Sequence, residues 1–173
     1  MDRRQKLWLT TWVLAISVAL DQATKVVAIE TLRGRAPQIF LGNVFRLEYS
    51  ENPGAFLSLG STLSESTRFW LLSVAVAISL LALLIYTLRY AEFTRVQLIG
   101  TLLLIGGGIS NLIDRLCRSH GQVVDFMNMG IGSLRTGVFN VADVFIMAGV
   151  GVLLIFGGRE GGREKSSTPP ARL

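Results

Sequence analysis

The sequence is poor in the residues that stabilise small secreted domains or build metal centres. It has one cysteine and one histidine among 173 residues, and only 17% of its residues are charged. The single cysteine, Cys117, cannot form an internal disulfide. The single histidine, His120, cannot supply a multi-histidine metal site. The composition therefore argues against a disulfide scaffold and against zinc chemistry, and we expect neither a metal nor another cofactor.

Apolar residues, in contrast, make up 50% of the chain, and the mean hydropathy is positive. This composition is typical of a membrane protein with one domain. Lysine and arginine outnumber aspartate and glutamate by 17 to 12, which in a soluble chain would suggest a nucleic-acid partner. Here the basic residues stand beside apolar segments and the aromatic residues form no stacking platform. Attraction to anionic lipid headgroups is the simpler explanation, and no nucleic acid is expected.

Long uncharged runs predict membrane-spanning helices. Residues 69–88 carry no charge, and this length matches a hydrocarbon core of about 30 Å at about 1.5 Å per residue. Residues 96–113 form a second uncharged run. Two shorter runs can span only if their helices continue through Asp21 and Asp143. We expect one α-helical membrane domain with four transmembrane helices, over residues 7–29, 69–88, 96–116 and 138–157.

Four spans bring several polar residues to one face of the membrane. The ends of the first and third helices and the start of the fourth lie at the same face, as do the connections 31–68 and 117–137. The polar residues gathered there are Asp21, Asn52, Asp114, Asp125 and Asp143. Carboxylates at bilayer depth are costly and usually mark function. Asp125 and Asp143 are the leading candidates for a reaction centre.

The basic residues also predict an orientation. They are densest at the start of the chain, in the short connection 89–95 and in the tail, which by the positive-inside rule places both termini in the cytoplasm and the acidic face outside. The start also loosely fits a cleavable signal, with Ser17-Val18-Ala19 as a small-x-small site. Helical continuation from Asp21 to Lys25, an i,i+4 pair, favours a retained span. Residues 158–173 are expected to be disordered.

The first outer connection contains a strand pattern. Phe45, Leu47 and Tyr49 alternate with polar residues, which is typical of a half-buried strand. We expect a small extracytoplasmic β element over residues 37–60, resting on the membrane surface. The other outer connection, 117–137, is expected to be an extracytoplasmic loop.

Five short motifs stand in or beside the expected spans: Asp21-Gln22-Ala23-Thr24-Lys25, Asn52-Pro53-Gly54-Ala55-Phe56, Asn111-Leu112-Ile113-Asp114-Arg115, Val123-Val124-Asp125-Phe126 and Phe139-Asn140-Val141-Ala142-Asp143. In this order they resemble the motifs of the bacterial lipoprotein signal peptidases, the type II signal peptidases. The resemblance covers nearly the whole chain. The second motif is one alanine shorter than is usual in that family, and Ser110 stands where many relatives have glycine.

The resemblance implies an aspartyl endopeptidase of the bacterial cytoplasmic (inner) membrane. Its substrates would be diacylglyceryl-modified prolipoproteins, cleaved before the lipidated cysteine, and its other partner membrane lipid, with the protein acting as a monomer. Asp125 and Asp143 match the catalytic pair of the family. The positions expected to bind substrate or support the site are Asp21, Lys25, Asn52, Gly54, Asn111, Asp114, Arg115 and Asn140.

Paired carboxylates suit this chemistry without a metal. Two carboxylates close together cannot easily both ionise, so one stays protonated at neutral pH. The charged one can deprotonate the attacking water, and the protonated one can donate a hydrogen bond to the scissile carbonyl oxygen. Which of Asp125 and Asp143 starts protonated is left open, because the pKa values belong to the pair.

The supporting residues also have structural explanations. Asp21 and Lys25 fit a helix-end ion pair as well as a role in shaping the site. Asn111, Asp114 and Arg115 share one helical face, so a buried ion pair that holds the helices together is an alternative to substrate contact.

Other functions remain as hypotheses. Asp125 fits a solvated loop acid and Asp143 a polar residue of helix packing, which would suit a catalytically inactive lipoprotein-binding relative. A small transporter also needs buried acids, but the sequence shows no repeat or broken helix pair. A serine protease lacks a convincing serine elbow and a zinc protease its His-Glu-x-x-His helix.

Overall fold

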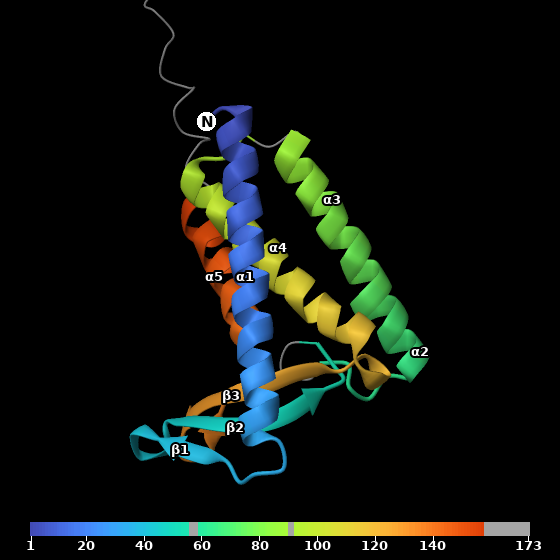
Figure 1. Cartoon of the computed structure of the whole chain (residues 1–173), viewed down its shortest axis with the longest axis vertical. Helices are drawn as coiled ribbons and strands as arrows, with labels where there is room; N and C mark the ends of the chain where they lie inside the picture. The colour runs from blue at the N-terminus through green and yellow to red at the C-terminus, as the bar shows by residue number, and fades with distance from the viewer. Residues whose placement is uncertain (56–58, 90–91, 158–173) are drawn as a thin grey trace, which may run out of the picture.

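The structure is a computed structural model, and it describes residues 1–55, 59–89 and 92–157. The tail expected to be disordered, residues 158–173, lies outside the described residues. Helices run roughly along the long axis of the molecule, and a small sheet lies across their lower end (Figure 1). The N-terminus is at the opposite end from the sheet.

The helices are α1 (Arg3–Leu32), α2 (Glu65–Arg68), the π-helical segment η3 (Phe69–Ala75), α3 (Val76–Arg89), α4 (Arg95–Cys117) and α5 (Val141–Phe156). Elements α2, η3 and α3 are continuous. In the part of the chain that the structure describes, three helices are long and apolar enough to cross a membrane: Arg3–Leu32, Glu65–Arg89 and Arg95–Cys117. The shorter apolar helix α5 has 16 residues. It begins at Val141 and not at the expected residue 138, because Asn140 caps it.

The sheet consists of β1 (Gln38–Phe40), β2 (Phe45–Asn52), β3 (Val123–Ile131) and β4 (Leu134–Arg135), antiparallel and in that spatial order. Two 3-10 turns, η1 (Leu41–Asn43) and η4 (Ser119–Gly121), stand before β2 and β3. Strands β1 and β2 fall within the expected β element.

The expectation of a loop over residues 117–137 was wrong, because β3 and β4 occupy much of this segment. Residues 123–126 are buried without the polar and apolar alternation of a strand that has one exposed face. The period-two signal is therefore missing, and the strand is recognised only through its pairing with β2.

The sheet packs against the lower part of α1. Ala28 and Leu32 of α1 form a buried cluster with Phe126 of β3, and partly buried Leu47 of β2 packs against it. Apolar burial of this kind stabilises by about 25 cal/mol per Å². This contact holds β3, and with it the carboxylate of Asp125, beside the helices.

Helix α4 packs against both α5 and α1. Close approach of α4 and α5 depends on glycine, because a Cβ at Gly149 would lie 2.5 Å from the carbonyl oxygen of Gly100 and 2.9 Å from the backbone nitrogen of Leu104. Small residues allow this spacing between helices in lipid. The result is that polar side chains of α4 reach the first turn of α5.

Candidate active site

Asp125 lies where the sheet meets the helices. It pairs with Ser50 of β2, and its side chain is 1% exposed. Asn52 Nδ2 donates a 2.8 Å hydrogen bond to Asp125 Oδ2, across 73 positions of sequence. The Oδ1 atom of Asn52 accepts a hydrogen bond from the Gly54 N–H at 2.9 Å, which sets the orientation of the amide. The second motif, although shortened, therefore places its asparagine on Asp125.

Asp143 lies in the first turn of α5 and is 7% exposed. Its Oδ2 accepts a 3.1 Å hydrogen bond from the backbone N–H of Asn140, and its own N–H donates at 2.9 Å to Asn140 Oδ1. This reciprocal arrangement is a capping box. Asn111 of α4 donates a 3.0 Å hydrogen bond to Asp143 Oδ1. Both oxygens of the carboxylate are therefore held.

Asn140 contacts both carboxylates. Its Nδ2 donates a 2.7 Å hydrogen bond to Asp125 Oδ1, while its backbone N–H binds Asp143 as described above. Asn140 is fully buried, so water does not compete for these bonds. One residue thereby brings together two acids that come from a strand and from a helix.

Burial, and after it the negative charge of Asp143, raises the pKa of Asp125 from 3.8 to about 7. Hydrogen bonds from Asn52 and Asn140 act in the opposite direction, because they stabilise the charged form. Asp125 therefore keeps a proton over much of the range in which an isolated aspartate is ionised. Burial is the larger cause of this rise, and the charge of the nearby Asp143 adds to it.

Lys25 is the cation of a buried network behind the pair. Its Nζ lies 2.7 Å from Asp21 Oδ2 and 3.0 Å from Asp114 Oδ2, and it donates a 2.9 Å hydrogen bond to Asn111 Oδ1. All of its side chain is buried. Of the two explanations left open by the sequence, the structure shows the ion pair, and the role in shaping the site stays a prediction. Lys25 pairs with the acids of two helices, and it also orients Asn111, which contacts Asp143.

Asp21 and Asp114 also bind the main chain one residue before each candidate carboxylate. Asp21 Oδ1 accepts a 2.8 Å hydrogen bond from the Ala142 N–H, and Asp114 Oδ2 accepts one of 3.2 Å from the Val124 N–H. The network thus positions the start of α5 and the start of β3. Both acids are paired with Lys25 and with a backbone N–H group.

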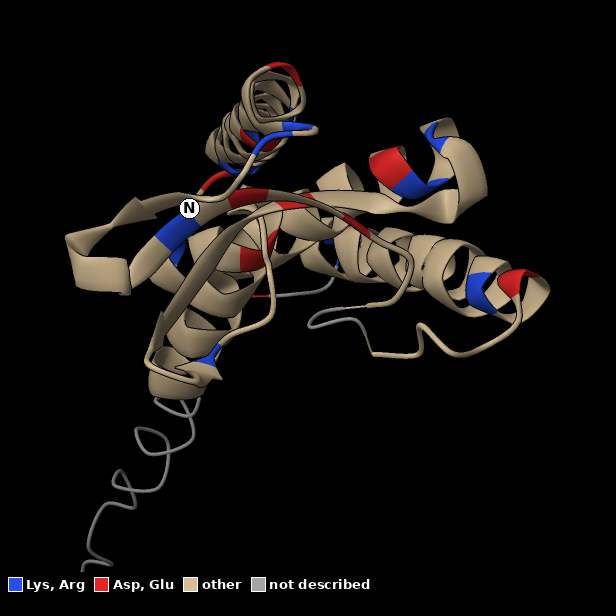
Figure 2. Cartoon of the chain, turned by 90° about the horizontal axis from the view of Figure 1, so that it is seen from below, with Lys and Arg blue, Asp and Glu red and all other residues tan. Residues whose placement is uncertain are grey.

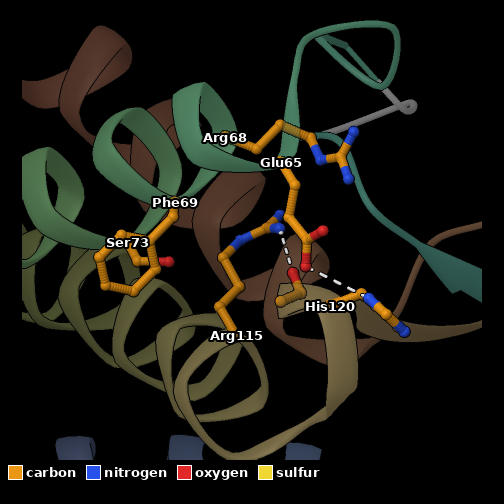
Figure 3. A pocket seen from close by; sticks show the side chains of 7 residues that line it. Glu65, Arg68, Phe69, Ser73, Arg115 and His120 are labelled. Atoms are coloured by element: carbon orange, nitrogen blue, oxygen red, sulfur yellow. Dashed lines mark hydrogen bonds and ion pairs between the residues drawn. The ribbon is translucent and has the colours of Figure 1, made fainter.

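Arg115 lies at the edge of the site. Its guanidinium donates to the carbonyl of Gly121 at 3.0 Å and to the carbonyl of Gly54. It lines a small pocket of about 130 Å³ together with residues of α2 and η3 (Figure 3). At the rim of this pocket His120 Nδ1 lies 3.2 Å from Glu65 Oε1. Arg115 therefore joins the segment after β2 to the turn before β3.

Sequence reasoning missed three residues of the network. Gln22 donates 3.1 Å hydrogen bonds to Ser110 Oγ and to Asp114 Oδ1, and Ser110 Oγ donates one of 2.7 Å to Asp21 Oδ2. Arg118 Nε lies 3.1 Å from Asp114 Oδ1. Gln22 stands inside the first motif, and Ser110 is where the chain departs from the family's glycine. These two sequence features could have drawn attention to Gln22 and Ser110. The hydrogen-bond partners of both residues lie on another helix, however, so the sequence did not reveal them.

The described residues contain no group of three or more His, Cys, Asp or Glu side chains placed to hold a metal ion. Seen from the sheet side, some acidic positions lie on strands near the middle of the molecule and others on helices toward its edges (Figure 2). The arrangement can hold a proton on one carboxyl group and a negative charge on the other, which is the requirement for general acid–base catalysis.

Helices long enough to cross a membrane and a buried carboxylate pair beside a small sheet together define a helical membrane protein with a candidate acid–base site. A profile of the family described as Signal peptidase (SPase) II matches residues 13–157. A lipoprotein signal peptidase of Treponema denticola is 34% identical over 96% of this chain and 100% of its own length. One from Geobacillus kaustophilus is 33% identical over 84% of this chain and 88% of its own. The chain belongs to the signal peptidase II family.

Solved structures show the same fold. Two structures, each described as a bacterial membrane enzyme, superpose on this chain with TM-scores of 0.77 and 0.71, both at 24% sequence identity. The first covers 93% of this chain and 94% of its own, and the second 87% and 93%. The arrangement of apolar helices with a small antiparallel sheet is therefore shared with membrane enzymes.

Proposed function

We propose that this protein is an aspartic endopeptidase that removes signal peptides from diacylglyceryl-modified prolipoproteins, cutting the bond before the lipidated cysteine. Family membership supports the peptidase activity, and the names of the relatives supply the substrate class. The observation that carries the aspartic mechanism is the link through Asn140, whose side chain binds Asp125 and whose backbone N–H binds Asp143. A catalytically inactive lipoprotein-binding relative is not favoured, because both carboxylates and their orienting asparagines are retained.

In this mechanism Asp125 holds the proton and Asp143 is the base. Burial and the charge of Asp143 raise the pKa of Asp125 to about 7, so Asp125 can donate a hydrogen bond to the scissile carbonyl oxygen at neutral pH. Asp143 then takes the proton of the attacking water. The protonated Asp125 is thus a hydrogen-bond donor that is already oriented before the oxyanion develops. A donor held in place in a buried site stabilises that charge without having to reorient during the reaction.

The site is proposed to lie at the outer face of the bacterial cytoplasmic membrane. With α5 as the fourth span, the start of α1 and the end of α5 are on the side opposite the sheet, and the density of basic residues in the sequence at these ends supports a cytoplasmic position for them. The 16 residues of α5 reach only about 24 Å, so the cap at Asn140 lies near the membrane boundary, within reach of water.

Isosteric substitution tests the mechanism. Asp125→Asn and Asp143→Asn should each lower the cleavage rate of a diacylglyceryl-modified precursor by at least about 100-fold, since each removes one acid–base group. Asp2→Asn is the matched control, because asparagine also caps α1, far from the site. An unlipidated precursor, assayed in parallel, should remain uncut. Full activity of either site variant, in protein that unfolds at the wild-type temperature, would refute the aspartic mechanism.

A further inference from the structure

An open apolar hollow of about 510 Å³ lies beside Asp143 on the exposed face of α5. It is lined by Met129 and Phe139 from the sheet side and by Asp143, Val144 and Met147 of α5. The hollow is within the size range of ligand sites, about 300–1,000 Å³. It thus extends from a candidate catalytic residue to the apolar outer surface of the helix.

Three residues line the hollow from the sheet side, and all of their main-chain N–H and C=O groups are already hydrogen-bonded. The N–H and C=O groups of Met129, Thr136 and Phe139 are all hydrogen-bonded to other groups of the protein, for example Thr136 N to Met129 O at 2.7 Å and Phe139 N to Met127 O at 2.8 Å. An extended peptide therefore cannot add as a further strand here. A ligand without polar groups meets no such difficulty.

The length of the hollow argues against a helix that crosses α5 as the occupant. Along α5 its lining runs from Asp143 to Ala148, which is about 8 Å at about 1.5 Å per residue, whereas a helix with its side chains is about 10–12 Å wide.

A second open hollow of about 470 Å³ follows α1 and is lined by apolar residues such as Val27 and Phe126. The residues lining that second hollow include neither Asp125 nor Asp143.

We propose that the hollow beside Asp143 binds the acyl chains of the substrate's diacylglyceryl group, an inference that rests on the proposed function. The lipid is carried by the residue whose amide nitrogen belongs to the scissile bond, so its chains must leave the site directly beside the carboxylate pair. Val144 is 46% exposed and Met147 is 55% exposed on the outer face of α5. Chains in the hollow therefore remain in the bilayer while the bond is cut, and Met147 limits the space for them.

Filling the hollow tests this assignment. Met147→Trp should raise the KM for a dipalmitoylglyceryl precursor about tenfold, equivalent to losing about two buried methylene groups, and should leave kcat within about twofold. For a diacetylglyceryl precursor, whose two-carbon chains occupy much less of the hollow, the KM should stay within about twofold of wild type. Leu154→Trp is the matched control, because Leu154 is 80% exposed on the same face of α5, about two turns beyond the hollow.

Met147→Ala provides a second test that does not depend on accommodating a larger side chain. It enlarges the hollow, so the KM for a branched diphytanoylglyceryl precursor should fall relative to the KM for the dipalmitoylglyceryl precursor. Equal changes for long and short chains, or no change in any variant, would overturn the proposal and favour a signal-peptide side chain or bulk lipid as the occupant. Failure of the wild-type protein to cut any lipidated precursor would instead refute the proposed function.

Discussion

Asn140 offers a way to change the proton affinity of the carboxylate pair while both acids stay in place. Asn140→Ser removes the amide that donates to Asp125, but serine still caps α5 and the backbone N–H still reaches Asp143. A hydrogen bond to a charged group contributes about 1.5–3 kcal/mol, and one pKa unit corresponds to about 1.4 kcal/mol. The loss should therefore raise the pKa of Asp125 by about one to two units.

The sign of the pH effect follows from the role of Asp125. Its proton is lost as the pH rises through a pKa of about 7, so the rate should fall on the alkaline side near this pH. When Asn140 no longer stabilises the charged form, the proton is retained to higher pH. The alkaline limb of kcat/KM should move upward by about one to two pH units in Asn140→Ser.

The assay is the pH dependence of kcat/KM for a diacylglyceryl-modified precursor, together with thermal unfolding in detergent. Asn140→Ala should show the same shift of the alkaline limb and should also lose about 1 kcal/mol of stability, because alanine cannot cap α5. The serine variant separates the two effects. An alkaline limb that stays at the wild-type pH in both variants would show that Asp125 does not hold the catalytic proton.

Two further predictions concern the scaffold. Lys25→Met leaves the buried carboxylates of Asp21 and Asp114 without their shared cation, which should cost about 3–5 kcal/mol in the free energy of unfolding, whereas Lys25→Arg, which keeps the charge, should cost less. Equal losses of unfolding free energy in Lys25→Met and Lys25→Arg would show that Lys25 stabilises the protein through its packing and not through its charge. Gly149→Ala should destabilise by about 1–3 kcal/mol because its Cβ would meet α4, while Gly151→Ala, with open space around it, should be neutral or stabilising by up to about 1 kcal/mol. Similar unfolding temperatures for the two alanine variants would contradict this account of α4–α5 packing.

The sequence alone determined the class of the protein. Uncharged runs matched to the thickness of a bilayer predict long apolar helices, because hydrocarbon leaves no solvent for unpaired backbone groups. Alternating helix directions then predict that Asp114 and Asp143 meet at one face. The half-buried strand at Phe45, Leu47 and Tyr49 was equally readable, because its period-two pattern is local. The motifs that resemble signal peptidase II also depend only on residue order.

Only the tertiary structure decided how the polar residues are connected. Residues 123–126 of strand β3 are buried without alternation, so this part of the strand lacks the period-two pattern, and its pairing with β2 is a long-range contact. The link through Asn140 joins residues of a strand and a helix, and Lys25 pairs with acids of two helices. Local patterns report which surface of an element is apolar, but hydrogen-bond partners depend on the distances and angles at which separate elements pack. That packing, set by glycine contacts and by the cluster under α1, decides which asparagine reaches which carboxylate.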